Sequence, residues 1–277
     1  MPLKLMYITS RPETARIAEE CGVDRIFVDM EYIGKSLRQG GMDTVQSHHT
    51  LEDVETIRGC ISRAELLVRC NPIHEAGEEC CSSKDEIDGI IERGADIIML
   101  PYFKTVDEVK LFISYVGGRA RTMLLFETAE AVSVIDEILT LEGINEVFIG
   151  INDLSLSYGK KFMFELLADG TVDRLCEKFR QKGLPYGFGG IASLGKGAVK
   201  SDYIIPEHYR LGSTCVILSR SFCNTSLISD PKEIARVFAN GVKAIRDYEE
   251  KCKTGDEWMH ENHLEMCRQV QKVVEGL

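Results

Sequence analysis

The amino-acid sequence predicts an α/β fold, a single (β/α)8 TIM barrel with an additional C-terminal helix. Eight short apolar runs alternate with amphipathic segments from one end of the chain to the other. The runs are almost continuously apolar, as the strands of a parallel sheet are when both faces are covered. Eight strand and helix units are the number that closes a barrel.

The elements follow from hydrophobic periodicity, taken in order along the chain. The expected strands cover residues 3–8, 25–30, 65–71, 97–102, 121–127, 146–151, 185–191 and 215–221. The expected helices cover residues 11–21, 50–61, 83–93, 105–116, 128–140, 171–182, 203–211 and 230–250. Thr50 and Asp53 have the spacing of a capping box at the start of the second helix. No Gly/Ser/Pro-rich linker interrupts this pattern, so we expect one domain over residues 1–252.

Residues 253–277 form an extension to the barrel. The segment Lys253-Thr254-Gly255 breaks the pattern, and Asp256 caps a last helix. The apolar side chains of this helix are Trp258, Met259, Cys267, Val270, Val273, Val274 and Leu277. A complete barrel leaves nothing for this stripe to cover, so we expect it to pack on another subunit of a homo-oligomer, or else across the barrel floor.

Charge and composition exclude several classes of partner. The 277 residues have a formal net charge of -11 and a pI near 5.2, which disfavours binding to nucleic acid or to an anionic membrane surface. We find no signal segment and no apolar stretch of membrane-spanning length, and we expect a cytoplasmic protein. Of the ten cysteines, most lie in apolar segments and are expected to be reduced core thiols, whereas Cys80 and Cys81 are adjacent in a polar loop.

Carboxylates follow the ends of two neighbouring strands. Glu127 comes after Met123-Leu124-Leu125-Phe126, and Asp153 lies just beyond Val147-Phe148-Ile149. A barrel gathers the C-terminal ends of its strands around one mouth. The two acids therefore outline a site for a divalent metal, Mg or Mn, since both ions prefer oxygen ligands. Helix capping is the alternative role for these acids.

Three further charged residues are predicted to lie at the same mouth. Asp29 and Glu31 follow the second strand, and Arg69 ends the third. An arginine among acids is the arrangement expected for a bound metal together with an anionic substrate. Gly150 and Asn152, beside Asp153, are predicted to contact that substrate.

Five motifs, in this order, resemble the HpcH/HpaI aldolase/citrate lyase family over roughly residues 20–195. They are Phe27-Val28-Asp29-Met30-Glu31, Leu67-Val68-Arg69-Cys70-Asn71-Pro72, Gly94-Ala95-Asp96-Ile97-Ile98-Met99-Leu100-Pro101, Phe126-Glu127-Thr128-Ala129-Glu130-Ala131 and Phe148-Ile149-Gly150-Ile151-Asn152-Asp153-Leu154-Ser155. The resemblance implies a barrel of the phosphoenolpyruvate/pyruvate-binding superfamily. It also implies Mg or Mn on Glu127 and Asp153, and a pyruvate enolate oxygen neutralised by Arg69.

The sequence departs from this family at one position. Aldolases of the family have a histidine just after the acids of the second strand, where this chain has Tyr32. A tyrosine with a pKa near 10 is a poor base at neutral pH. Lys35 and Arg38 in the following glycine-rich loop are predicted to hold a phosphate or a second carboxylate, with a solvated surface loop as the alternative. His48 and His49 are candidates to swing over the mouth, although His49 also directly precedes the helix cap.

These observations predict a metal-dependent carbon–carbon lyase or aldolase with a class II mechanism. Its substrates would be a 2-oxo acid, bound as a pyruvate-like enolate, and an aldehyde or acyl partner. Arg69, Asp29 and Glu31 are the predicted catalytic residues, and the acid/base that handles the alcohol proton is not identified. The alternatives are a citrate-lyase-like acyl-CoA lyase and a non-catalytic binding protein that retained the pocket.

Overall fold

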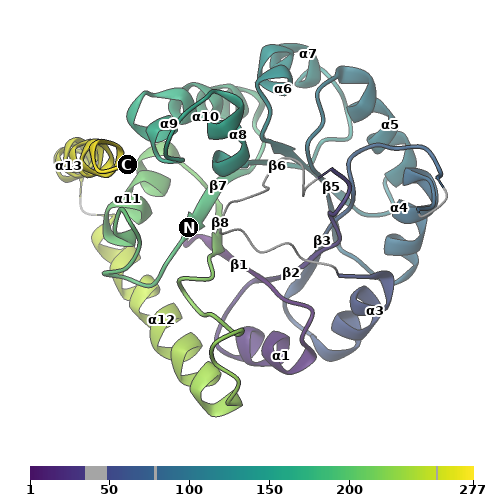
Figure 1. Ribbon diagram of the computed structural model, residues 1–277, viewed down its shortest axis with the longest axis horizontal. Coiled ribbons are helices and arrows are strands. Elements are labelled where there is room, and N and C mark those ends of the chain that lie inside the picture. The colour runs from purple at the N-terminus through teal and green to yellow at the C-terminus, as the bar shows by residue number, and fades with distance from the viewer. Residues whose placement is uncertain (35–48, 78–79, 254) are drawn as a thin grey trace.

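The protein folds as a closed barrel of eight parallel strands in sequence order, β1 to β8, surrounded by helices (Figure 1). The computed structural model describes residues 1–34, 49–77, 80–253 and 255–277. Each strand pairs with the next, and β8 closes the ring on β1. The predicted (β/α)8 fold with an additional C-terminal helix is confirmed.

The strands lie where the apolar runs predicted them. They are β1 (Lys4–Ile8), β2 (Arg25–Asp29), β3 (Glu65–Arg69), β4 (Ile97–Leu100), β5 (Arg121–Phe126), β6 (Glu146–Ile149), β7 (Tyr186–Ile191) and β8 (Cys215–Leu218). The helices are α1 (Pro12–Glu20), α3 (Leu51–Cys60), α4 (Ser83–Glu92), α5 (Val106–Val116), α6 (Ala129–Ser133), α7 (Ile135–Ile138), α8 (Ile151–Ser157), α9 (Glu165–Ala168), α10 (Thr171–Lys182), α11 (Ser201–Leu211), α12 (Pro231–Lys251) and α13 (Asp256–Glu275). None of the helices in the described ranges is long and apolar enough to cross a bilayer.

The structure differs from the prediction in several segments, and the strands expected over 65–71, 97–102 and 215–221 end two or three residues early. The single helix expected over 128–140 is two short helices, α6 and α7, which meet at Val134. The strand expected over 146–151 ends at Ile149, because Gly150 is the N-cap of α8. Helices as short as α8 and α9 complete at most two turns, so their apolar residues do not establish a 3.6-residue period.

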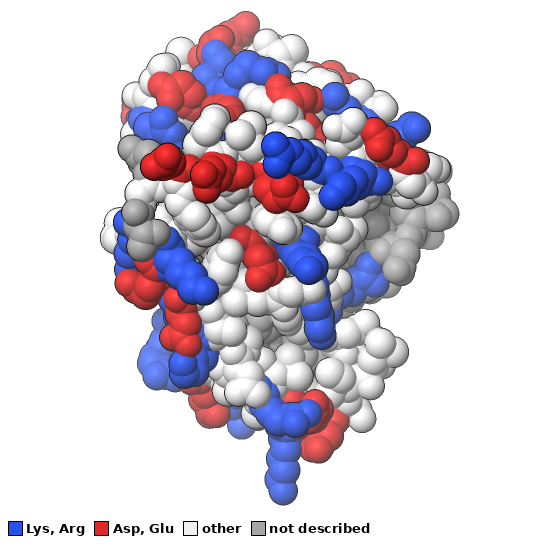
Figure 2. Space-filling view, turned by 90° about the vertical axis from the view of Figure 1, so that its left-hand side faces the viewer, with Lys and Arg blue, Asp and Glu red and all other residues white. Residues whose placement is uncertain are grey.

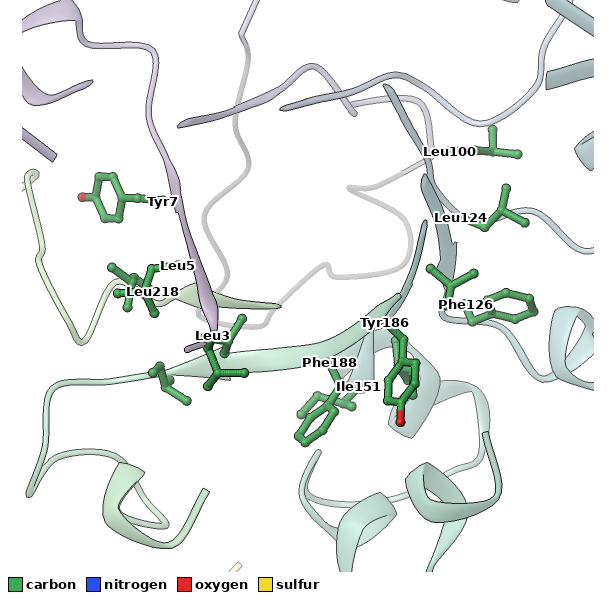
Figure 3. Close-up of a cluster of buried hydrophobic side chains, with 14 of the residues drawn as sticks. Leu3, Leu5, Tyr7, Leu100, Leu124, Phe126, Ile151, Tyr186, Phe188 and Leu218 are labelled. Carbon is green, nitrogen blue, oxygen red and sulfur yellow. The ribbon is translucent and has the colours of Figure 1, made fainter. Parts of the chain in front are cut away.

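The apolar core has two layers separated by the barrel wall. Inside the barrel, side chains from successive strands fill the axis, among them Met6, Phe27, Met99, Met123 and Phe148. Outside it, side chains on the other face of the strands pack under the helices; Figure 3 shows Tyr7, Leu100, Leu124 and Phe126 pointing outward from their strands. This double burial accounts for the unbroken apolar runs in the sequence.

Charged residues form a network at the N-terminal ends of the strands. Arg25, fully buried, donates from Nη1 and Nη2 to the two carboxylate oxygens of Glu146, each at 2.8 Å. Its Nε donates to Glu65 at 2.7 Å, and Arg121 pairs with both acids. This network holds four strands together at the floor of the barrel, opposite the mouth.

The floor network makes stability depend on pH in the acid range. Burial raises the pKa of Glu65, but hydrogen bonds and charge from Arg25 and Arg121 outweigh it and hold that pKa at about 2, below the ordinary 4.5. A depressed carboxylate pKa adds stability that is fully present above about pH 4.5 and is lost as the pH falls towards 2. Urea unfolding at pH 5 and at pH 3 tests this. From pH 5 to pH 3, the free energy of unfolding should fall further in the wild-type protein than in Glu65→Gln. Equal losses in the two proteins would contradict this assignment.

Helix α13 packs on its own chain, against α11 and α9. Met266 and Val270 are buried there, and Asn262 donates to the carbonyl of Tyr203 at 3.0 Å. The inference that the barrel leaves nothing for this helix to cover is therefore wrong. Sequence reasoning missed the contact because part of it is polar: His263 Nδ1 lies 2.9 Å from buried Glu207. On the side of the molecule where α13 lies, acidic and basic side chains are interspersed (Figure 2).

Assembly of the protein as a homo-oligomer through α13 stays a prediction, and it can be tested directly. Trp258, Met259 and Val274 are only half-buried, so part of the apolar stripe still faces outward. Covering a large apolar side chain gains about 1.5–3 kcal/mol. Truncation after Lys253 should therefore reduce the number of subunits in the assembly, as measured by light scattering. An unchanged number of subunits would show that α13 serves its own barrel alone.

Candidate active site

The mouth of the barrel is organised around Arg69, the last residue of β3. The strand register places it directly beside Asp29, the last residue of β2. Its Nε and Nη2 donate to the two carboxylate oxygens of Asp29, each at 2.8 Å, and its Nη1 lies 3.3 Å from Glu31. Both acids are almost fully buried, at 2% and 1% exposure. These contacts on two edges fix the orientation of the planar Arg69 guanidinium. Its remaining N–H groups are still available as donors.

Glu127 and Asp153 are the two predicted metal ligands. Glu127 directly follows β5, and Asp153 lies in α8, which follows the neighbouring strand β6. Glu127 is buried, and its Oε1 accepts a hydrogen bond from the backbone N–H of Tyr102 at 2.9 Å. Tyr102 is the one described non-glycine residue with a positive φ, +48°. Asp153 is half-buried in the first turn of α8 and accepts from the Asn152 amide at 3.1 Å. The left-handed backbone of Tyr102 is a strained conformation of the kind typical of functional sites.

Gly150 leaves space for the Glu127 carboxylate. A Cβ placed on Gly150 would lie 2.7 Å from Glu127 Oε2, closer than side-chain atoms pack. The glycine of the motif is therefore required by its neighbour, in addition to any contact with a substrate. Larger side chains at this position would displace the carboxylate from the mouth.

Negative charge dominates this part of the mouth. Burial raises the pKa of Glu127 well above its usual range, and the charges of Glu31 and Asp153 raise it further, against the opposing effect of Arg69. Burial alone would lower the pKa of Arg69, but Asp29 and Glu31 outweigh it and raise that pKa. The guanidinium thus shares one positive charge among several carboxylates. Such a site fits a divalent cation, which would stabilise the ionised form of Glu127.

The described residues supply few metal ligands beyond these two acids. Within the described ranges, no cluster of three or more His, Cys, Asp or Glu side chains has metal-binding geometry. An ion held by Glu127 and Asp153 would complete its coordination with oxygens of water and substrate, as Mg²⁺ often does.

A cavity of about 180 Å³ opens beside the acids. Its polar lining residues are Arg69, Glu127, Asn152 and Asp153, and its apolar walls include Phe27, Met99, Leu125 and Phe148. Gly150, Gly189 and Gly190 also line it, which brings backbone to its surface. A space of this size suits a small acid of a few carbon atoms.

His49 also lies at the mouth, which sequence reasoning had not favoured. The predicted capping box of Thr50 and Asp53 is present at the start of α3. The residue before it, His49, accepts a hydrogen bond at Nδ1 from the backbone N–H of Asp29 at 3.0 Å. It lines a cavity together with Asp29 and Arg69. With Nδ1 as an acceptor, the neutral imidazole has its proton on Nε2.

Other predicted residues fall outside the site or outside the described ranges. Lys35, Arg38 and His48 lie in the segment 35–48, which the structure does not describe. Tyr32, at the position of the family histidine, is 45% exposed, and its backbone N–H donates to Asn71 at 2.9 Å. All ten cysteines are free thiols, and five of them are buried, namely Cys70, Cys176, Cys215, Cys223 and Cys252.

Known proteins share both sequence motifs and fold with this chain. A sequence model of the HpcH/HpaI aldolase/citrate lyase family matches residues 4–165. An HpcH/HpaI aldolase/citrate lyase family protein from Burkholderia cenocepacia J2315 superposes with a TM-score of 0.62 at 15% identity, over 84% of this chain and 94% of that one. An HpcH/HpaI aldolase from Desulfitobacterium hafniense DCB-2 gives 0.55 at 16% identity, over 88% and 93%. No protein with a curated description matches. Because the family match extends over more than half of its length, the chain belongs to the HpcH/HpaI aldolase/citrate lyase family.

Proposed function

We propose that the protein is a divalent-metal-dependent aldolase or carbon–carbon lyase that acts on a 2-oxo acid. The observation that supports this proposal is the placement of buried Glu127 and half-buried Asp153 beside Arg69 in one small cavity. When bound there, Mg²⁺ or Mn²⁺ would polarise the carbonyl group of a 2-oxo acid and favour its enolate.

Arg69 stabilises the negative charge that develops on the enolate oxygen. Its bidentate pairing with Asp29 fixes the guanidinium before substrate arrives, so little reorganisation is needed in the transition state. Asp29 and Glu31 are positioning residues for Arg69 in this scheme. This assigns them a supporting role in place of direct acid/base work.

His49 is our candidate for the missing acid/base. Its imidazole lines the mouth beside Asp29 and Arg69, and the Asp29 N–H fixes its tautomer. In the direction of bond formation, one proton leaves the methyl group of the 2-oxo acid and one reaches the new alcohol oxygen. Histidine has a pKa suited to both transfers at neutral pH.

Glu127→Gln and Asp153→Asn test the metal site. Each amide keeps the shape of the side chain and removes the charge that holds the ion. We expect calorimetry with Mn²⁺ to show an affinity lower by about tenfold or more in each variant. Glu130→Gln is the matched control, because Glu130 is exposed, lies three residues from Glu127 and pairs with Lys104.

Activity is tested by metal-dependent exchange of the pyruvate methyl hydrogens in D₂O, followed by NMR. This reaction needs the enolate alone and no knowledge of the aldehyde. We expect exchange in the wild-type protein with Mn²⁺ and its loss in both variants. Neither acid caps a helix, since Thr128 caps α6 and the N-cap of α8 is Gly150. Unchanged Mn²⁺ affinity in both variants would therefore reject the metal site, and absence of exchange would favour a binding protein.

A further inference from the structure

A buried hydrogen-bond network joins the ends of β2 and β3 to helix α4. It centres on Asn71, which follows Arg69 by two residues and is 3% exposed. The Oδ1 atom of Asn71 accepts hydrogen bonds from the backbone N–H groups of Tyr32 and Ile33, at 2.9 and 3.0 Å. One side-chain oxygen thus holds two consecutive residues of the segment that follows β2.

Glu86, in the first turn of α4, fixes the orientation of this asparagine. Asn71 Nδ2 donates to Glu86 Oε1 at 2.8 Å, and the Asn71 backbone N–H donates to the two carboxylate oxygens at 3.2 and 3.3 Å. Because the amide nitrogen of Asn71 faces Glu86, its amide oxygen faces Tyr32 and Ile33. A reversed amide would set its nitrogen against two N–H donors.

The burial of Glu86 is not offset by an ion pair among the described residues. Glu86 is 4% exposed, and its carboxylate has hydrogen bonds with Asn71 there. Burial raises the pKa of Glu86, and the hydrogen bonds from Asn71 oppose that rise. Burying an acid in this way costs stability, and an apolar residue of the same size would avoid that cost. The orientation of Asn71 is therefore the effect that accounts for an acid at this position.

The network holds Glu31 at the edge of the Arg69 guanidinium. The N–H of Met30 donates to the carbonyl of Arg69 at 3.0 Å, and the N–H of Glu31 donates to Asp29 Oδ1 at 3.2 Å. The next two N–H groups are those that donate to Asn71. Because the backbone is held on both sides of Glu31, its buried carboxylate lies 3.3 Å from Arg69 Nη1.

We propose that Asn71 and Glu86 are positioning residues that act on the reaction through Glu31 and Arg69. The proposal rests on the proposed function, because it needs Arg69 to stabilise the enolate oxygen. Neither Asn71 nor Glu86 lines the cavities at the mouth, so neither is expected to contact the substrate. Without them, Arg69 would keep its pairing with Asp29 along one edge and lose the fixed position of Glu31 at the other.

Amide hydrogen exchange followed by NMR tests the network without any substrate. We expect the N–H groups of Tyr32 and Ile33 to exchange about tenfold faster in Asn71→Ala and in Glu86→Leu, the equivalent of one lost hydrogen bond. Glu86→Gln keeps an oxygen acceptor for the Asn71 amide. It should therefore bring both exchange rates back to within about twofold of the wild type.

Two matched controls are available in the described part of the chain. Asn145→Ala removes an asparagine whose Oδ1 accepts from the backbone N–H of Thr122 at 2.8 Å, at the floor of the barrel. Asp85→Leu removes the acid next to Glu86 in the first turn of α4, where Asp85 is exposed. Both controls should leave amide exchange at the mouth and the rate of the reaction as in the wild type.

Pyruvate methyl exchange with Mn²⁺ tests the link to Arg69. Asn71→Ala should lower kcat by about tenfold and leave KM for pyruvate within about twofold, because the enolate charge develops in the transition state. In an Arg69→Lys background the same substitution should change kcat by less than about twofold. The group through which Asn71 acts is then already lost, so the two effects are not additive.

The results separate this proposal from the proposed function. Wild-type kcat in Asn71→Ala, or equal losses of kcat in the wild-type and Arg69→Lys backgrounds, would overturn the positioning role and leave the aldolase in place. If the wild-type protein shows no pyruvate exchange, the proposed function fails, and the NMR signal of the Arg69 Nε–H reports its position. That signal should shift in Asn71→Ala and stay unchanged in Asn145→Ala. An unchanged signal in both variants would overturn the positioning role by itself.

Discussion

Replacing Arg69 with lysine is expected to lower kcat by about 10²–10³-fold while the barrel stays folded. Lysine keeps the charge but loses the planar fork. The two 2.8 Å contacts with the oxygens of Asp29 cannot both be reproduced by one ammonium group in the same geometry. The loss should fall mainly on kcat, because the enolate charge develops in the transition state.

Pyruvate methyl exchange measures this effect without an aldehyde. Arg268→Lys is the matched control, since Arg268 is 69% exposed on α13 and pairs along its own helix with Glu265. If Arg69→Lys changed thermal stability but left the exchange rate as in the wild type, the arginine would be a structural partner of Asp29 and Glu31.

Glu146→Gln is expected to cost about 3–5 kcal/mol of unfolding free energy, because it leaves a buried arginine without its main counter-charge. Arg25 is fully buried, and both of its terminal nitrogens donate to Glu146. In the Glu146→Gln variant, Glu65 would remain as a counter-charge for Arg25, with its carboxylate 2.7 Å from Nε.

Urea unfolding of the two proteins at neutral pH measures this cost. Glu233→Gln on the surface of α12 is the comparison, because its partner Arg236 is 69% exposed and such pairs contribute about 1 kcal/mol or less. A loss below that of the surface variant would show that Arg25 finds other compensation at the barrel floor.

The barrel could be predicted from sequence because its strands are buried on both faces. Eight uninterrupted apolar runs separated by amphipathic segments fit few other folds, and acids or an arginine directly after such runs must lie at the mouth. The placement of Glu127, Asp153 and Arg69 around one cavity follows from this reasoning. The short helix that contains Asp153 was not found, because its seven residues are too few to establish a period.

Other parts of the site depend on contacts between residues far apart in the chain. His49 lies 20 positions from Asp29 and comes back to its backbone N–H. The local sequence shows only that His49 precedes the helix cap Thr50. In the structure His49 both precedes this cap and accepts the hydrogen bond from Asp29. The pairing of Asp29 and Glu31 with Arg69 likewise depends on the register of β2 and β3, which apolar runs do not specify.

The charged pairs at the two ends of the β2–β3 ladder select one alignment of the strands. In the observed register Arg25 stands beside Glu65, and Asp29 beside Arg69. A slip of two residues would keep each side chain on its own face of the sheet. That slip would set Arg25 against Leu67 and Arg69 against Phe27. Burying ions without partners costs several kcal/mol for each one. The pair that orients Arg69 at the mouth therefore also helps to exclude a mispaired barrel during folding.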